Sequence, residues 1–267
     1  MSRAFRYAAS ALLRNAIPFL SLLALAPVLR GFSPWAPWLL APALGLCLYR
    51  LTIVMHDCVH RTLFASPRLN VRIGRLLGAV TAVDFASFTK QHLRHHRNYG
   101  GPGDPQAFQY AGVSAMSRPR FAWHLLRPLL GFNLRYALPE TLANPRNWRG
   151  FELGVFAAFQ AAIAALVTGG GAWLELALLP PVSAATFGLF FSQLRGIAEH
   201  APGRDRQGAR FVRSHAPTAV DRLFLYDLNF NYHAEHHRFP RHPSRELASV
   251  RPVKLAPGML RTLASLR

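Results

Sequence analysis

Residues 35–60 read WAPWLLAPALGLCLYRLTIVMHDCVH, an apolar run that leads directly into the histidine pair His56 and His60. The apolar part, from about Trp35 to Met55, contains a single charge at Arg50. A helix of this length can cross a hydrocarbon core of roughly 30 Å, because each residue adds about 1.5 Å. The stretch therefore predicts a membrane-spanning helix that presents histidine side chains at one membrane surface.

Three further apolar runs predict three more spans, at residues 15–29, 153–167 and 176–194. Pro180 and Pro181 lie inside the last of these runs. Since proline lacks a backbone N–H and clashes with the preceding turn, we expect a kink or a late helix start there. Two other apolar stretches, Leu76–Phe88 and Phe121–Leu138, are too short or too charged to cross and predict helices lying in the membrane interface.

The N-terminal run has a second interpretation as a signal peptide. Three arginines precede it, and Ala24-Leu25-Ala26 resembles a signal-peptidase site. Pro27 follows directly and makes a poor context for cleavage. The sequence therefore favours a retained span over a cleaved signal.

Basic residues are distributed unevenly among the loops. Residues 61–149 and 195–267 hold 13 Lys and Arg each, whereas Arg30 is the only charge between the first two runs. The tip between the last two runs, Gly169-Gly170-Gly171, carries no charge. By the positive-inside rule, both termini and the middle loop face the cytosol.

These features predict an all-α membrane protein in one integral-membrane domain over residues 1–267. Four transmembrane helices form two hairpins, with interfacial helices and a cytosolic helical cap from 56–150 and 195–267. The composition agrees, since 51% hydrophobic and 16% charged residues lie between the values for a soluble domain and for a bundle of spans. We expect the cytoplasmic membrane as the location.

The formal net charge of +19 limits the partners of the chain. Its basic residues lie in loops that flank apolar runs, which disfavours nucleic acid and favours anionic headgroups or an anionic substrate carrier. Cys47 and Cys58 imply no disulfide framework, so a reducing cytosolic side is compatible. We expect Cys58 to be a buried structural thiol.

Most of the twelve histidines fall into three short motifs. His56 and His60 form an HxxxH pair, and two HxxHH motifs comprise His92, His95 and His96, and His233, His236 and His237. On a helix, residues at i, i+3 and i+4 share a face, so each motif is expected to present its imidazoles as one cluster. Neutral imidazole is a good ligand for iron, zinc, copper and nickel. Eight or nine such groups exceed the roughly four to six ligands of one ion and predict two metal ions.

The motifs HDCVH, HLRHH and NYHAEHH, in this order, resemble the three histidine boxes of membrane fatty acid desaturases. The segments HRTLFASPRLNVRIGRLLGA and HHRFP are similar to that family too, and the resemblance covers roughly residues 45–245. It implies two iron ions (a di-iron centre), dioxygen as co-substrate, and metal ligation by His56, His60, His92, His95, His96, His233, His236 and His237. It also suggests His200, in Arg-Gly-Ile-Ala-Glu-His, as a further ligand.

Several polar residues near the motifs are candidates for supporting roles: Asp57, Glu199, Glu235, Asp104 and Asp227. Ligating imidazoles usually donate their other N–H to a carboxylate, so we expect these acids to orient the histidines. Direct ligation, as in soluble di-iron bundles, is the alternative. Asn231 is expected either to hold a metal-bound water or to form a turn. The histidines His124, His215 and His242 match no motif and are predicted to be surface or packing residues.

The predicted function is a membrane-bound di-iron oxygenase, a desaturase that acts on an acyl-lipid, acyl-CoA or acyl-carrier substrate. Neither a CxxCH haem motif nor enough cysteines for an iron–sulfur cluster are present, so a ferredoxin or a small haem protein is the expected electron donor. One alternative is a related hydroxylase or ketolase acting on carotenoid, alkane or another lipid. A non-catalytic membrane metal-binding protein is the other, although that class would carry its ligands within the spans. The phenylalanines Phe187, Phe190 and Phe191 would line an apolar substrate channel or serve in helix packing.

Overall fold

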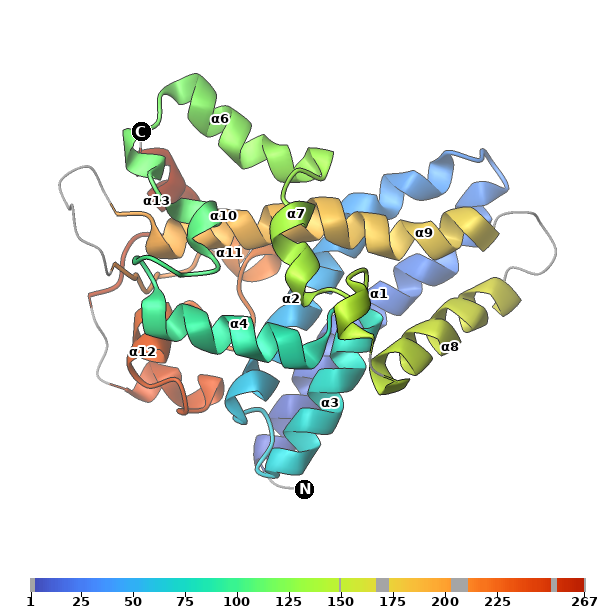
Figure 1. Cartoon of the computed structure of the whole chain (residues 1–267), viewed down its shortest axis with the longest axis horizontal. Helices are drawn as coiled ribbons and strands as arrows, with labels where there is room; N and C mark the ends of the chain where they lie inside the picture. The colour runs from blue at the N-terminus through green and yellow to red at the C-terminus, as the bar shows by residue number, and fades with distance from the viewer. Residues whose placement is uncertain (1–2, 149, 167–172, 203–210, 251–253, 267) are drawn as a thin grey trace.

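The computed structural model describes residues 3–148, 150–166, 173–202, 211–250 and 254–266 (Figure 1). This part of the chain is helical and holds no β-strand, only the isolated bridges Val83–Thr141 and His215–Ala256. The longer helices are α1 (Arg3–Arg30), α2 (Ala41–His60), α3 (Pro67–Val80), α4 (Phe85–Asn98), α8 (Gly150–Leu166), α9 (Trp173–Ser183) and α10 (Leu189–His200). The shorter ones are α5 (Ala107–Tyr110), α6 (Arg118–Leu126), α7 (Leu134–Ala137), α11 (Ala219–Phe224), α12 (His233–Arg238) and α13 (Met259–Ser265).

Short 3₁₀ helices connect these elements: η1 (Ala36–Leu40), η2 (Val113–Ala115), η3 (Arg127–Leu130), η4 (Leu138–Glu140), η5 (Pro145–Asn147) and η7 (Ser244–Ser249). The π-helical segment η6 (Ala184–Gly188) joins α9 to α10. Helix α2 lies at the centre, since it packs against α1, α3, α9 and η6 and is buried along most of its length. Its last turn therefore carries His56 and His60 into the interior.

Three helical segments are long and apolar enough to cross a membrane, namely Ala4–Arg30, Ala36–His60 and Ala177–His200. These apolar helices indicate a membrane protein. The first and second extend well beyond the predicted runs at 15–29 and 35–55, because helical structure continues through charged residues and histidines that a hydropathy criterion excludes. The run at 153–167 lies mostly in α8, whose apolar stretch Gly150–Ile163 is shorter, and its last residue falls outside the described part.

The late helix start expected at Pro180 and Pro181 is wrong, because α9 begins at Trp173 and contains both prolines. The wider turns of η6 follow directly, where the hydrogen-bond ladder adjusts to the missing N–H groups. Figure 1 shows α9 and α10 continuing in nearly one direction across this segment. Gly45 of α2 touches it so closely that a methyl group there would overlap Phe187.

The single helix predicted over Leu76–Phe88 is also wrong, because α3 ends at Val80 and a new helix, α4, begins at Phe85. Asp84 caps α4, since its carboxylate accepts a hydrogen bond of 2.8 Å from the N–H of Ser87. This cap fixes where the helix that carries the second histidine motif begins. The run Phe121–Leu138 is likewise broken, at Gly131, which has a φ of 77°.

A buried carboxylate ties the N-terminal helix to the segment that precedes the third motif. Asp227 accepts hydrogen bonds from Arg14 at 2.8 Å, Asn15 at 2.6 Å and Arg50 at 3.2 Å. Charge-assisted hydrogen bonds of this kind are strong when buried. They hold α1, α2 and the chain leading to α12 together.

Candidate metal centre

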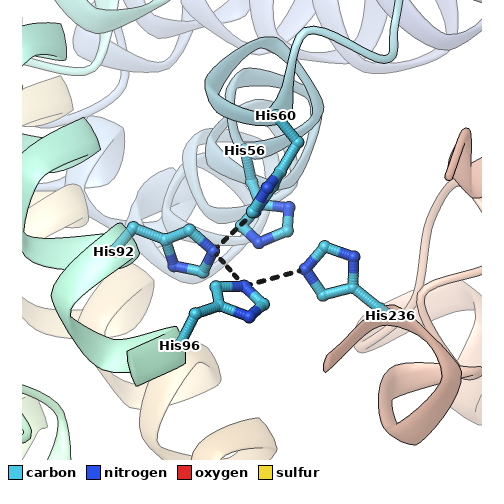
Figure 2. A group of neighbouring side chains, drawn as sticks. All are labelled: His56, His60, His92, His96 and His236. Atoms are coloured by element: carbon cyan, nitrogen blue, oxygen red, sulfur yellow. Dashed lines mark hydrogen bonds between the residues drawn. The ribbon is translucent and has the colours of Figure 1, made fainter. Parts of the chain in front are cut away.

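Nine histidines from four helices converge in two groups, within each of which the ring nitrogens lie within 4.8 Å of one another. The five-histidine group contains His56, His60, His92, His96 and His236, and the four-histidine group contains His95, His200, His233 and His237. Figure 2 shows the five-histidine group, with α2, α4 and α12 each directing side chains toward a common centre. All nine histidines named from the sequence are therefore brought together.

Each HxxHH motif was predicted to form one cluster. In the structure, both motifs are instead divided between the two groups. Within α4, His92 and His96 enter the five-histidine group while His95 enters the other. At about 100° per residue, positions i and i+4 lie only about 40° apart, whereas i+3 and i+4 are about 100° apart. Helix α12 repeats the split, with His233 and His237 in one group and His236 in the other.

The separations of the ring nitrogens are those of neighbouring metal ligands. The Nε2 atom of His92 lies 2.9 Å from Nε2 of both His60 and His96. In the other group, Nε2 of His233 lies 3.0 Å from that of His200 and 3.1 Å from that of His237. A neutral imidazole has one N–H, so these nitrogens cannot satisfy one another by hydrogen bonds alone. Ligands at right angles on bonds of about 2.1 Å lie about 3 Å apart, which matches these separations.

Burial keeps the imidazoles in the form that binds metal. Burial lowers the pKa values of His92, His233, His236 and His237 well below the ordinary value of 6.5, and the neighbouring imidazoles add to the effect. Among the described residues, neither ring nitrogen of buried His56 has a hydrogen-bond partner. An unsatisfied buried polar group costs about 1–3 kcal/mol, which a bound cation would offset. The residues present thus fit two metal ions.

Two carboxylates contact ring nitrogens of the four-histidine group. Asp104 accepts a hydrogen bond of 2.9 Å from Nδ1 of His95 and another from the hydroxyl of Tyr110. Burial opposes ionisation here, but these hydrogen bonds hold the pKa of Asp104 below its usual value. Asp104 therefore fixes the tautomer of His95 with Nε2 turned to the group.

Glu199 was expected to accept a hydrogen bond from the outer N–H of an imidazole. Its carboxylate instead lies 3.2 Å from Nε2 of His233, the nitrogen that faces the other histidines of the group. Arg195 donates to the same carboxylate at 2.8 Å and lies 3.4 Å from Nδ1 of His233. The guanidinium offsets the buried negative charge. Glu199 thus contacts the inner nitrogen of His233, Nε2, rather than its outer nitrogen, Nδ1.

The remaining polar candidates bind partners outside the two histidine groups. Asp57 accepts hydrogen bonds from Thr62 and Ser244, and Asp227 binds α1 and α2 instead. Glu235 accepts a hydrogen bond from the hydroxyl of Ser214. The Asn231 side chain donates to the carbonyl of His215 at 3.0 Å, which fits the turn interpretation.

The three histidines outside the motifs belong to neither group. His124 lies 2.6 Å from the carbonyl of Gln109, and His215 lies 2.8 Å from the carbonyl of Pro257. Both are buried, and His242 is partly buried. Cys47 and Cys58 are buried free thiols, as expected for Cys58.

Two adjoining cavities lie beside the histidines. The smaller, of about 100 Å³, is lined by histidines of both groups together with Arg195 and Glu199. The larger, of about 310 Å³ and mostly apolar, shares six lining residues with it: Tyr49, Thr52, Phe88, Gln106, Gln109 and Ser192. Small residues of η6 and α10 line the larger cavity. Phe187, Phe190 and Phe191 do not line it, and Phe187 and Phe191 pack against the hydrophobic core, which is the packing alternative. The small residues Ala184, Ala185 and Gly188 leave room for this cavity, and their clustering in the sequence is the signal that could have predicted it.

Over its described residues, the fold and the site define a helical protein with three helices long and apolar enough to span a membrane and two histidine groups able to hold metal. The chain belongs to the fatty acid desaturase family, whose sequence model matches residues 33–265, and this membership indicates an oxidoreductase of lipid metabolism. The resemblance stated from the histidine motifs is thereby confirmed.

Several sphingolipid desaturases are similar to this chain. The sphingolipid delta(4)-desaturase/C4-monooxygenase of Bos taurus is 29% identical over 230 residues, which cover 81% of this chain and 65% of the bovine protein. Its Rattus norvegicus counterpart is 29% identical over 242 residues, covering 85% and 68%. The sphingolipid delta(4)-desaturase of Homo sapiens is 26% identical over 225 residues, covering 80% and 64%. The chain thus spans about two thirds of the length of these relatives.

Proposed function

We propose that this protein is a membrane-bound di-iron desaturase that introduces a double bond into a lipid chain, using dioxygen and electrons from a separate donor. The observation that carries the proposal is the pairing of two histidine groups with an apolar cavity that adjoins them. Family membership and the names of the relatives support lipid desaturation as the reaction. A ferredoxin or a small haem protein is the proposed donor.

The residues of this chain divide the work between binding metal and placing substrate. The five- and four-histidine groups would each hold one iron, and bound iron would supply oxidation of an unactivated C–H bond by dioxygen. Asp104 orients His95, and Arg195 together with Glu199 supplies a buried ion pair at the edge of the smaller cavity. Tyr49, Thr52 and Phe88, which line both cavities, would place the reacting methylenes next to the histidines.

The proposed membrane arrangement has four spans, with the site and both termini on the cytosolic side of the cytoplasmic membrane. Helix α8 would complete the fourth span, since it packs against α9 and the Gln160 side chain donates to the carbonyl of Ala177. The 13 and 13 basic residues of 61–149 and 195–267 support this orientation. All of it would form one domain over 1–267.

A second candidate is hydroxylation at the same site, because the names of several relatives combine desaturase with C4-monooxygenase. The two reactions differ only in the fate of the oxidised carbon. The substrate of this chain is proposed to be a fatty acyl lipid, with a sphingolipid base as the alternative that the relatives suggest.

The test is expression in a host that lacks unsaturated lipids, followed by mass analysis of total lipid and metal analysis of the purified protein. A product lighter by two hydrogens supports desaturation, and one that gains an oxygen atom from labelled dioxygen supports hydroxylation. About two irons per chain are expected. A single bound zinc, no iron and unchanged lipid would contradict the proposal. The His92→Ala variant should be inactive, and His242→Ala serves as the matched control.

A further inference from the structure

One acidic side chain, Glu140, lines the large apolar cavity and makes no hydrogen bond or ion pair with the described residues. Glu140, at the end of η4, is part of the cavity wall together with apolar residues such as Val83, Ala137 and Pro181. In the part of the chain that the structure describes, its carboxyl group has no hydrogen bond or ion pair. Burial alone raises the pKa of this group. Two other polar side chains of the wall are paired, since Gln109 donates to Ser192 and the Tyr136 hydroxyl accepts from Arg135.

The backbone holds Glu140 in place from both sides. Its carbonyl accepts a hydrogen bond of 2.8 Å from the N–H of Asp84, the cap of α4. The N–H of Leu142 donates to the carbonyl of Ala82 at 2.9 Å, and the Asn147 side chain donates to the carbonyls that flank Glu140. The position of the Glu140 backbone beside the cavity is therefore set by the fold.

An acid in this position has a defined hydrogen-bonding character. Burial raises the pKa of Glu140 to about 8, so the group is mostly neutral at physiological pH. A neutral carboxyl offers one O–H donor and one carbonyl acceptor. A hydroxyl or an amide can satisfy both, whereas a plain hydrocarbon chain would leave both unsatisfied at a cost.

We propose that Glu140 recognises a hydroxyl or amide group on the lipid substrate, so that the cavity selects a polar-substituted chain over a plain one. The inference rests on the proposed function, because it takes the cavity to hold the lipid. Glu140 lies level with Asp84, and His92 follows eight residues later on α4, about 12 Å along the helix. The recognised group would therefore lie on the order of 12 Å from the carbon that is oxidised.

The test measures binding to the iron-loaded, detergent-purified protein by displacement of a fluorescent fatty acid. The probes are octadecanoate and a series of its monohydroxy isomers, which share one head group. We expect at least one isomer to bind about tenfold more tightly than octadecanoate, and Glu140→Leu to abolish this ratio. Glu140→Gln should retain most of it, because an amide also donates and accepts. Glu246→Gln, at an exposed carboxylate outside the cavity, should leave the ratio unchanged.

The outcomes separate this inference from the function on which it rests. Octadecanoate that binds as tightly as every isomer overturns the role of Glu140 and leaves the lipid cavity intact. The same follows if Glu140→Leu keeps the wild-type ratio. If no chain displaces the fluorescent probe, the cavity is not a lipid site, and the proposed function fails together with the inference. If the leucine variant does not fold, the ratio of hydroxy-isomer to octadecanoate affinity in wild type and in the glutamine variant still decides whether Glu140 recognises the hydroxyl group.

Discussion

Replacement of His200 by alanine should remove one metal ion and leave the other. His200 belongs only to the four-histidine group, where its Nε2 lies 3.0 Å from that of His233. Its ring also packs 4.9 Å from the ring of His95 and 5.0 Å from that of His237. With His200 gone, that group retains three imidazoles, while the five-histidine group keeps all its members. We expect bound iron to fall from about two to about one per chain.

The contrast with His60 sharpens this prediction, because His60→Ala leaves four imidazoles in its own group, a usual number for one ion. His60→Ala should therefore keep close to two irons and change mainly the spectrum of one of them. Elemental analysis and Mössbauer spectroscopy of the detergent-purified variants measure both effects. His242→Ala is the control, since it belongs to neither group.

The cost to folding should be modest in comparison. His200 is 3% exposed, so its removal opens a small buried space worth on the order of 2 kcal/mol. A retained elution profile in detergent would show that the loss of iron is local. A His200→Ala protein that holds both irons with an unchanged spectrum would refute the assignment of His200 to the metal centre.

Three further predictions follow from the same geometry. Asp104→Asn should weaken iron binding by the four-histidine group about 10–100-fold in a chelator competition, because His95 loses its carboxylate partner. The contribution of Glu140 to stability should fall as the pH rises from about 4.5 to about 8, because folded Glu140 keeps a proton that the unfolded chain releases; the difference in unfolding free energy between wild type and Glu140→Gln should therefore change by at most about 1.4 kcal/mol per pH unit in this range, measured by denaturant unfolding. Ser33→Cys should react with an impermeant thiol reagent from outside intact cells and Ser117→Cys only after permeabilisation, and the reverse pattern would overturn the proposed orientation.

The identity of the histidines could be predicted from sequence, but their division could not. The spacing of His92, His95 and His96 shows that they share one side of α4. Whether a side chain 60° or 100° away meets the same ion depends on where α2 and α12 lie, and the motif carries no information on that. Asp104 was a candidate because it lies near the histidine motifs in sequence, yet only the loop after α4 brings it to His95.

Acidic residues were the least predictable part of the site. Asp227 precedes His233 closely in sequence, but its partners Arg14 and Asn15 lie more than 200 residues away. Glu140 sits in no motif at all, and it reaches the cavity because the chain around it pairs with Ala82–Asp84. Such long-range pairings are decided by packing, and local sequence patterns record only the helices that take part.

The way the helices share the two groups has a mechanical consequence. Helices α4 and α12 each supply histidines to both groups, whereas α2 serves only the five-histidine group and α10 only the four-histidine group. A shift of α4 relative to its neighbours would therefore disturb both ions at once, while a change at the end of α10 acts on one. The cap by Asp84 and the backbone pairing beside it fix the start of α4 and the position of the Glu140 backbone through the same few hydrogen bonds. The distance from Glu140 to the oxidised carbon of a bound substrate would be set along α4, which also carries three of the nine histidines.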